Sequence, residues 1–285
     1  MTPLSAHIEG IGFWTRGLPS WGTAIAYATD DGGGTPVADA PARPSPQLLP
    51  ANERRRAPDT VAVALEVALA ACQDAGRDPA TLPSVFASTH GDLGITDYMC
   101  ATLAGDPQAL SPTRFHNSVH NAAAGYWTIG TGAMAPASAI SAREASFAQG
   151  LLDALAQLAC GDEAVLLVAY DGQAAGPLAR MAPSEGLLGG ALVLSREAAP
   201  GRPQLRVQLT ARSGGRDARG PLSTLAAANA MAPMLPLFDL LARGHGHVHL
   251  VAGPDHDLLV ELTPAQGAAS EDAPVAGALL EFAHG

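Results

Sequence analysis

The sequence has 285 residues, of which 47% are apolar and 15% charged, a balance typical of a well-packed globular protein that excludes disorder throughout. Its 27 acidic residues outnumber 16 basic ones, all of them Arg because the chain has no Lys, so the formal net charge is −11. This charge argues against nucleic acid or an anionic membrane as a partner.

The first ten residues have neither the charged nor the apolar segment of a secretion signal, and the longest apolar runs are too short to span a membrane. The three scattered cysteines are too few for a disulfide framework or a metal cluster. His245, His247 and His249 alternate along one segment, which favours a solvated strand end over a metal site. We therefore expect a cytoplasmic protein without a membrane span, a metal or a cofactor.

Strand and helix patterns alternate along the first hundred residues. Residues 7–15 alternate as a strand does, and we expect this strand at a sheet edge. The Gly-, Pro- and Asp-rich residues 30–50 predict a loop. Helical spacing of apolar residues follows over 60–75, then a short strand over 84–91 and a helix over 97–103.

The central stretch, residues 111–172, carries the features on which a function would depend. After a polar segment, an apolar helical run extends from Asn121 to Gly132, and Ala137 to Ser141 predict a short strand. A helix is expected from Ala142 to Cys160, apolar almost all round and hence buried. Residues 163–171 are nearly all apolar, as in a central strand that is covered on both faces.

The start of the buried helix has a local signature of its own. Ser141 and Glu144 have the spacing of a capping box, in which each side chain bonds a free backbone N–H at the helix start. Gly150 in the helix interior predicts that another backbone packs closely there.

The remaining residues complete an α/β pattern. Residues 189–197 and 203–212 predict two strands joined in a hairpin, 224–244 a helix broken near Pro233 to Pro236, and 247–264 a pair of short strands. The last twenty residues are expected to be loose. The order of elements predicts a mixed sheet with crossovers.

Several segments together resemble the N-terminal half of a β-ketoacyl synthase, namely SPTRFHNSVHNAAAGYWTIG, PASAISAREASFAQGLLDAL and GDEAVLLVAYDG. LLPANERRRAPDTVAVALEVALAAC followed by LPSVFASTHGD is similar to short ketosynthase-like chain length factors of aryl polyene pathways. The resemblance implies a thiolase-like α/β fold with a mixed sheet and a buried helix, truncated to one half of the double fold. It implies one domain over 1–285, with a loop at 30–50 and a shortened C-terminal extension at 211–285.

In that family the buried helix begins with a nucleophilic Cys, and Glu144 falls at its place. Nothing after residue 210 resembles the family's catalytic His motifs, so the resemblance implies a pseudoenzyme with no catalytic residue of its own. A sharper alternative is malonyl decarboxylation, because related chain length factors carry Gln at this place. The charge of Glu weakens that alternative, since it would repel the malonyl carboxylate, and a helix-capping role is favoured.

The polar segment before the apolar helical run supplies the other candidate residues. The resemblance implies that they reach a subunit interface and close a partner's acyl tunnel: Arg114, Phe115, His116, Asn117, Ser118, His120 and Asn121. Alternatively, these residues cap the following helix at Asn121 and bond within a buried loop. A Ser–His hydrolase is disfavoured because no nucleophile elbow is present.

We therefore expect a non-catalytic chain length factor that pairs with a ketosynthase and completes and limits its acyl tunnel, in polyene, polyketide or fatty-acid-like elongation. The strand at Ala137 to Ser141 would pair across that heterodimer. An acyl carrier protein would be reached through the complex, and no nucleic acid is expected. Two alternatives stay open: a stand-alone acyl- or malonyl-thioester decarboxylase or hydrolase, and a purely stabilising scaffold.

Overall fold

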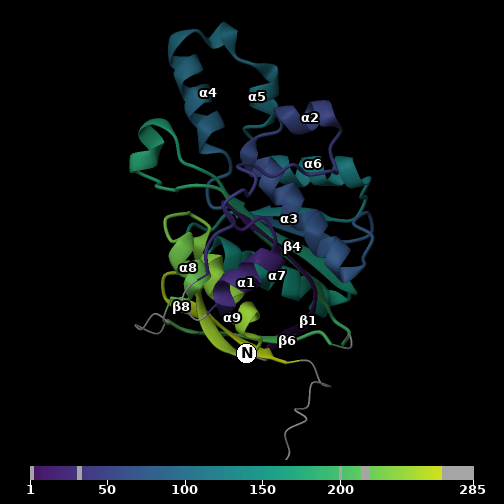
Figure 1. The fold of residues 1–285 in the computed structure, drawn as a ribbon. Coiled ribbons are helices and arrows are strands. Elements are labelled where there is room, and N and C mark those ends of the chain that lie inside the picture. Colours follow the sequence, from purple (N-terminus) through teal and green to yellow (C-terminus); the bar gives the residue numbers. More distant parts are fainter. Residues whose placement is uncertain (1–2, 31–33, 199–200, 213–218, 265–285) are drawn as a thin grey trace, which may run out of the picture.

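An eight-stranded mixed sheet forms the centre of the protein (Figure 1). The computed structural model describes residues 3–30, 34–198, 201–212 and 219–264. The order across the sheet is β3-β2-β4-β5-β1-β6-β8-β7. The strands are β1 (Leu4–Thr15), β2 (Ser84–Ala87), β3 (Ala137–Ile140), β4 (Ala164–Asp171), β5 (Leu188–Ser195), β6 (Gln204–Ala211), β7 (Gly246–Val251) and β8 (His256–Thr263).

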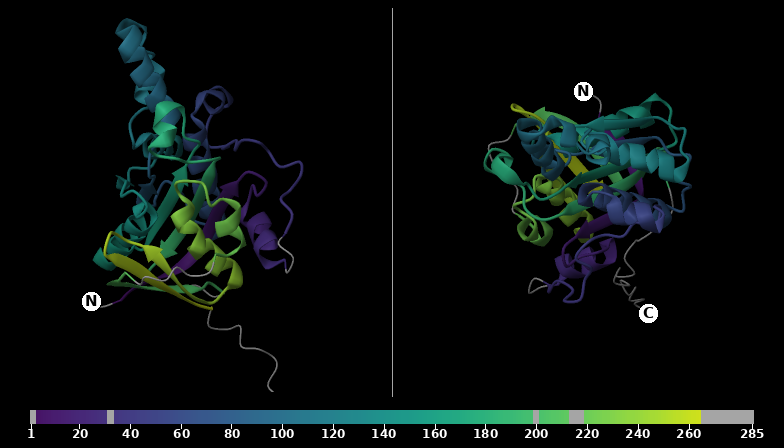
Figure 2. Two further views of the ribbon diagram at one scale, coloured as in Figure 1. Left: turned by 90° about the vertical axis from the view of Figure 1, so that its left-hand side faces the viewer. Right: turned by 90° about the horizontal axis from the view of Figure 1, so that it is seen from above.

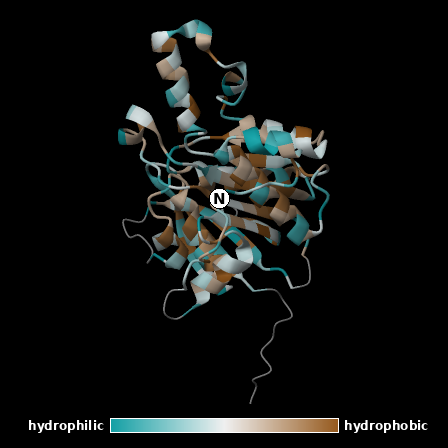
Figure 3. Ribbon diagram, turned by 45° about the horizontal axis from the view of Figure 1, so that its top comes forward, coloured by the Kyte–Doolittle hydropathy of each residue, from teal (hydrophilic) through white to brown (hydrophobic). Residues whose placement is uncertain are grey.

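Helices cover both faces of this sheet. On one face α3 and α6 pack over β1, β2, β4 and β5, and on the other α7, α9, α8 and α1 share a core with the strands. Apolar colouring runs along the central strands and the helices against them (Figure 3). The described helices are α1 (Trp21–Thr29), α2 (Ala51–Arg56), α3 (Asp59–Ala75), α4 (Leu93–Gly105), α5 (Pro112–His116), α6 (Ala122–Thr131), α7 (Ser146–Cys160), α8 (Pro221–Leu225) and α9 (Leu235–Arg243), with short 3-10 turns η1 (Pro107–Ala109), η2 (Gly176–Arg180) and η3 (Ala232–Met234).

Several predicted elements are confirmed. β4 is buried at every residue between β2 and β5, as its apolar run predicts. α3 ends at Gly76, whose φ of 66° is the left-handed conformation that Gly adopts readily. The described part of 30–50 is a loop. The helix predicted over 224–244 is only partly confirmed: α9 forms its second part, but residues 226–234 are not α-helical, so the break begins well before Pro233. The helix expected over 97–103 is longer, because Asp92 caps it and it starts at Leu93. The last twenty residues lie outside the described ranges.

Two predictions about the sheet are wrong. β1 is not an edge strand, because it lies between β5 and β6 and pairs antiparallel with both. Consequently β5 and β6 do not form a hairpin, and β6 pairs with β1 and β8 instead. The physical reason is length: β1 has 12 residues, so its first part pairs with β6 while its later part pairs with β5.

A β-bulge at Glu9 changes which face of the sheet the even-numbered residues of β1 point to. The pairing of β1 with β5 shifts between Ile8 and Gly10, so Glu9 is the extra residue. Before the bulge Ile8 faces the α7 side, whereas after it Gly12 faces α3. In a regular strand these two even-numbered residues would face the same side.

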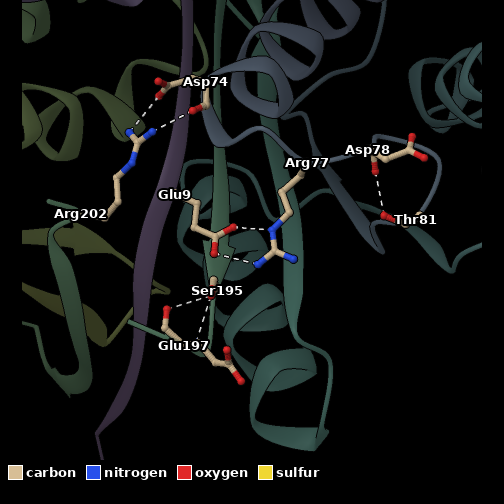
Figure 4. Close-up of polar contacts among 8 residues, drawn as sticks. All are labelled: Glu9, Asp74, Arg77, Asp78, Thr81, Ser195, Glu197 and Arg202. Carbon is tan, nitrogen blue, oxygen red and sulfur yellow. Dashed lines mark hydrogen bonds and ion pairs between the residues drawn. The ribbon is translucent and has the colours of Figure 1, made fainter. Parts of the chain in front are cut away.

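The bulged residue forms an ion pair in which the Glu9 side chain is nearly buried and that of Arg77 is 35% exposed (Figure 4). The carboxylate of Glu9 accepts hydrogen bonds from Nε and Nη2 of Arg77 at 2.7 and 2.8 Å. Nearby, Asp74 accepts from the Ile11 N–H at 2.9 Å, and its backbone carbonyl accepts from Arg202 at 2.8 Å. These contacts join the end of α3 to β1 and to the segment before β6.

We expect Glu9→Gln to destabilise the protein at neutral pH by about 1.5–3 kcal/mol, the range for hydrogen bonds to charged groups. The bonds from Arg77 lower the pKa of Glu9, so the unfolded chain takes up its proton at a higher pH than the folded chain does. The pair therefore stabilises the fold above the ordinary Glu pKa and loses this effect as pH falls through the lowered one.

Urea unfolding at pH 7 and near pH 3 measures this difference. The difference in unfolding free energy between wild type and Glu9→Gln should shrink at the lower pH. Glu53 is an exposed carboxylate on α2, so Glu53→Gln should change the unfolding free energy little at either pH. An equal gap at both pH values would contradict the assigned role of the charge.

Candidate functional site

The turn between β3 and α7 is the most strained part of the described backbone. Arg143 has φ 56°, the only positive φ at a described non-glycine residue. Such a conformation costs roughly 1–3 kcal/mol. It is held because Ser146 donates its hydroxyl to the Arg143 carbonyl at 2.6 Å and accepts the Ala142 N–H at 2.9 Å. The chain is therefore not helical before Ser146, and the predicted helix start at Ala142 is wrong by four residues.

The predicted capping box is also wrong. The N-cap of α7 is Ala145, without a side-chain cap, and the Ser141 hydroxyl donates to the Thr89 carbonyl at 3.0 Å. The Glu144 side chain is 54% exposed and lies 3.7 Å from Nη2 of Arg212, at the end of β6. An ion pair this exposed and this long contributes about 0–1 kcal/mol.

The body of α7 is only partly as predicted. Its inward face is buried on the sheet, but Ala156, Ala159 and Cys160 are exposed, so the helix is not covered all round. Gly150 does mark a close approach, because a Cβ there would lie 3.1 Å from the side chains of Ala87 and Leu167. The neighbours are side chains of the sheet rather than a second backbone.

A buried carboxylate lies below this turn, at the carboxyl end of β4. Asp171 is 1% exposed and accepts hydrogen bonds from the Ser88 hydroxyl at 2.8 Å and from the backbone N–H groups of Thr89 and His90 at 2.8 and 3.1 Å. Burial raises the pKa of Asp171, and these donors oppose the rise by favouring the charged form. The carboxylate thereby fixes the turn that follows β2.

Distant segments meet at this same place. The Asn229 amide donates to the carbonyls of Glu185 at 3.0 Å and of Asp171 at 3.3 Å. The Thr89 hydroxyl lies 3.3 Å from the Ala230 carbonyl and 3.4 Å from that of Arg143. The sequence places polar residues after β2 and β4, which is a usable signal for Thr89 and Asp171, but nothing in it connects Asn229 with them.

Beside this centre, α4, η1 and α5 form an arm, residues 93–116, that stands out from the body (Figures 1 and 2). No residue of the three elements is buried. Its root is tied to the body through Asp92, which accepts the Thr60 hydroxyl at 2.8 Å. The polar candidate residues of the sequence lie on this arm and on its return to α6.

The candidate residues of the arm fall into different environments. Phe115 is 58% exposed, whereas its two neighbours contact rings: Arg114 lies over Tyr98 and His116 meets Tyr126 edge-on. Phe115 is therefore the residue of this group that is free to enter another molecule.

The other candidates lie between the arm and α6. Asn117 is 5% exposed, and its side-chain oxygen has no protein partner among the described residues. Ser118 donates its hydroxyl to the Phe115 carbonyl at 2.8 Å. Asn121 takes the N-cap position of α6, but its side chain makes no capping bond, so the expected cap is absent there.

His120 belongs to the root of the arm. Its Nε2 lies 2.9 Å from the Ser88 carbonyl, an acceptor, so this nitrogen carries the proton. Ser88 also accepts the Gly91 N–H, and it therefore links the outgoing and returning chains of the arm.

The candidate residues on the arm and its return to α6 do not assemble a Ser–His pair. His120 bonds a carbonyl, and the hydroxyl of Ser118 is engaged elsewhere. Burial raises the pKa of the Cys72 thiol to about 12, and Cys160 lies at the far end of α7 from the strained turn. In the described ranges no group of three or more His, Cys, Asp or Glu residues is placed to hold a metal ion, and no helix is long and apolar enough to cross a membrane.

An open groove runs along the outer side of β3. Residues of β3 and of its following turn form one wall, and α7 forms the other; the lining residues are Ser138, Ile140, Ser141, Ala142, Gln149, Leu152 and Asp153. β3 pairs only with β2, so its other edge is free of strands in the described chain. Two exposed apolar side chains lie on neighbouring segments: Ile129, 80% exposed, on α6, which contacts β3, and Met134, 95% exposed, just before β3 in the chain.

The family described as "Beta-ketoacyl synthase, N-terminal domain" matches residues 31–250. The chain belongs to this family. A search of curated proteins finds no match.

Solved structures show the same thiolase-like fold. A chain of the ketosynthase (ApeO) in complex with its chain length factor (ApeC) from Xenorhabdus doucetiae aligns with a TM-score of 0.70 at 23% identity, over 90% of this chain and 99% of that one. The ishigamide ketosynthase/chain length factor gives 0.66 at 16% identity, over 92% and 99%. A type II PKS acyl-carrier protein in complex with its ketosynthase (AntDE:AntF) gives 0.67 at 11%, over 92% and 99%. At these identities the likeness establishes the fold.

Proposed function

We propose that this protein is the non-catalytic chain length factor subunit of a heterodimer with a ketosynthase, whose acyl tunnel it completes and limits. The observation that carries the proposal is the free edge of β3, with the exposed apolar residues on neighbouring segments, and the projecting arm. A monomer that left such an edge open would be prone to association. The fold likeness to chains of ketosynthase and chain length factor complexes supports this choice of partner.

The turn before α7 supports the proposed absence of a catalytic role. A condensing enzyme needs a thiolate at the start of the buried helix, and this chain has Glu144 there, half exposed and facing Arg212. Glu144 would repel the carboxylate of a malonyl group at this position unless Arg212 left Glu144 and paired with that carboxylate instead. The stand-alone decarboxylase or hydrolase is therefore the weaker proposal, since neither Glu144 nor the candidate residues of the arm form a nucleophile–base pair.

The wider setting belongs to the same proposal. The partner would carry the acyl chain and receive it from an acyl carrier protein, in polyene, polyketide or fatty-acid-like elongation, with aryl polyene synthesis as the specific pathway. Residues 211–285 would be a shortened C-terminal extension that is too short to supply the second α/β half of a complete synthase. A cytoplasmic location fits the three unpaired thiols.

Phe115 provides the test. In a reconstituted complex with the cognate ketosynthase, we expect Phe115→Ala to lengthen the product by one or more extension units and Phe115→Trp to shorten it, because the side chain would occupy tunnel volume. Mass spectrometry of the released products measures this length. Val37→Ala, an exposed apolar residue of the 34–50 loop, is the control. Product length that is unchanged across the series would favour a purely stabilising scaffold.

A further inference from the structure

The arm lacks the usual source of rigidity. Its three elements contain no buried residue, so burial of apolar surface cannot by itself hold α5 in place. The described contacts that connect α5 with α4 are few, and they gather on one side chain, Tyr98, in the middle of α4.

Tyr98 contacts the connection between the two helices with its hydroxyl group. This oxygen accepts the Ser111 N–H at 3.2 Å and lies 3.5 Å from the Ala109 carbonyl, to which it can donate. Ser111 is the N-cap of α5, and Ala109 is the last residue of η1. The hydroxyl therefore ties the start of α5 to α4.

The ring of Tyr98 makes a second contact. The guanidinium carbon of Arg114 lies 3.9 Å from the ring centroid, well within the range of a cation–π interaction. Arg114 precedes the exposed Phe115 directly in the chain. On its other side, Phe115 is followed by His116, whose ring meets Tyr126 of α6 at 6.2 Å between centroids.

We propose that Tyr98 and Arg114 form a clip that fixes α5 against α4 and thereby sets where Phe115 is presented. Both are positioning residues in this proposal, which rests on the chain length function proposed above. In this proposal Arg114 acts by holding Tyr98 and does not itself line the acyl tunnel. The side chain of Phe115 would set the product length, and the clip would set how sharply that length is defined.

Hydrogen exchange on the full chain tests the clip without a partner. Tyr98→Leu and Arg114→Gln should each speed exchange of the backbone amides from Gln108 to His116 about fivefold, which corresponds to about 1 kcal/mol. Tyr98→Phe should have a smaller effect because it keeps the ring, and Arg114→Lys should rescue most of the protection because it keeps a cation.

The double variant supplies an internal check. Because Tyr98 and Arg114 share one contact, Tyr98→Leu combined with Arg114→Gln should exchange no faster than the more affected single variant by more than twofold. Arg206→Gln on the exposed side of β6 is the matched control. Two results would overturn the clip. One is an exchange rate of residues 108–116 in Tyr98→Leu that is within twofold of wild type; the other is a rate increase in the double variant equal to the product of the increases in the two single variants.

Product analysis in the reconstituted complex tests its consequence. Tyr98→Leu should broaden the length distribution around the wild-type product, whereas Phe115→Ala shifts it. Faster exchange with an unchanged spread, in a complex that does respond to Phe115, would overturn the positioning role. If Phe115 variants also leave the products unchanged, the proposed function fails, while the exchange data still decide whether the clip exists.

Discussion

We expect Gly12→Ala, which adds one methyl group, to be the most destabilising substitution of this size in the sheet. It should lower the free energy of unfolding by about 3 kcal/mol or more, the upper range for overpacked sites. A Cβ on Gly12 would lie 2.0 Å from the Val67 carbonyl oxygen of α3, and one on Gly10 would lie 2.1 Å from that of Ala71. Val67 and Ala71 are one helical turn apart, so the two glycines form the surface on which α3 crosses β1. Because the obstructing atoms are backbone, the whole helix would have to move away.

Urea unfolding, together with the soluble yield on expression, measures this effect. Gly125→Ala is the matched control, because Gly125 lies within α6 and a Cβ there meets no atom within 4 Å. It should stabilise the protein by about 0.5–1 kcal/mol, since Ala is the better helix former. A Gly12→Ala protein with an unfolding free energy within 0.5 kcal/mol of wild type would show that α3 does not need this close approach.

The second large effect is expected at the free edge of β3. The N–H of Ser84 and that of Ser88 donate to the carbonyls of Pro136 and Ile140, so even-numbered residues of β3 bond to β2. Since bonding alternates along a strand, the N–H of Ala139 points to the open edge. Ala139→Pro removes that donor without removing a bond to β2. We expect it to weaken the heterodimer by about 1–3 kcal/mol, or roughly fivefold to 150-fold in Kd.

Titration with the cognate ketosynthase, followed by mass photometry or calorimetry, measures the Kd. Ala139→Val keeps the N–H and should bind nearly as wild type does. The unfolding transition of Ala139→Pro should stay close to that of wild type, because edge strands tolerate Pro. If the Pro variant is equally stable and binds equally well, β3 does not pair across the interface.

The elements that are predictable from sequence are those whose pattern is local and unbroken. β4 is apolar throughout and α3 has an apolar face that ends at Gly76, so both follow from composition and spacing alone. β1 does not, because the bulge at Glu9 exchanges its two faces and its partner strands lie more than 170 residues away. The alternation of residues 7–15 predicts a strand, but it does not show the bulge or the distant partners, so it does not show that the strand lies inside the sheet.

The candidate site shows the same division. The spacing of Ser141 and Glu144 fits a capping box, yet the left-handed Arg143 keeps the chain out of the helix until Ser146. Local spacing cannot reveal this, because the turn is held by Ser146 and by contacts with Thr89 from a different strand. The sequence identifies the polar segment before α6 as a candidate. Only the fold shows that part of this segment lies on an arm, where Phe115 is exposed and Arg114 contacts Tyr98.

The composition of the native complex tests the central claim most directly. A tagged copy, purified from its own host and weighed intact by native mass spectrometry, should be recovered 1:1 with a second chain whose peptides include a ketosynthase active-site cysteine. Recovery of this protein alone, as a complex of identical copies, or with a partner that lacks such a cysteine would contradict the account.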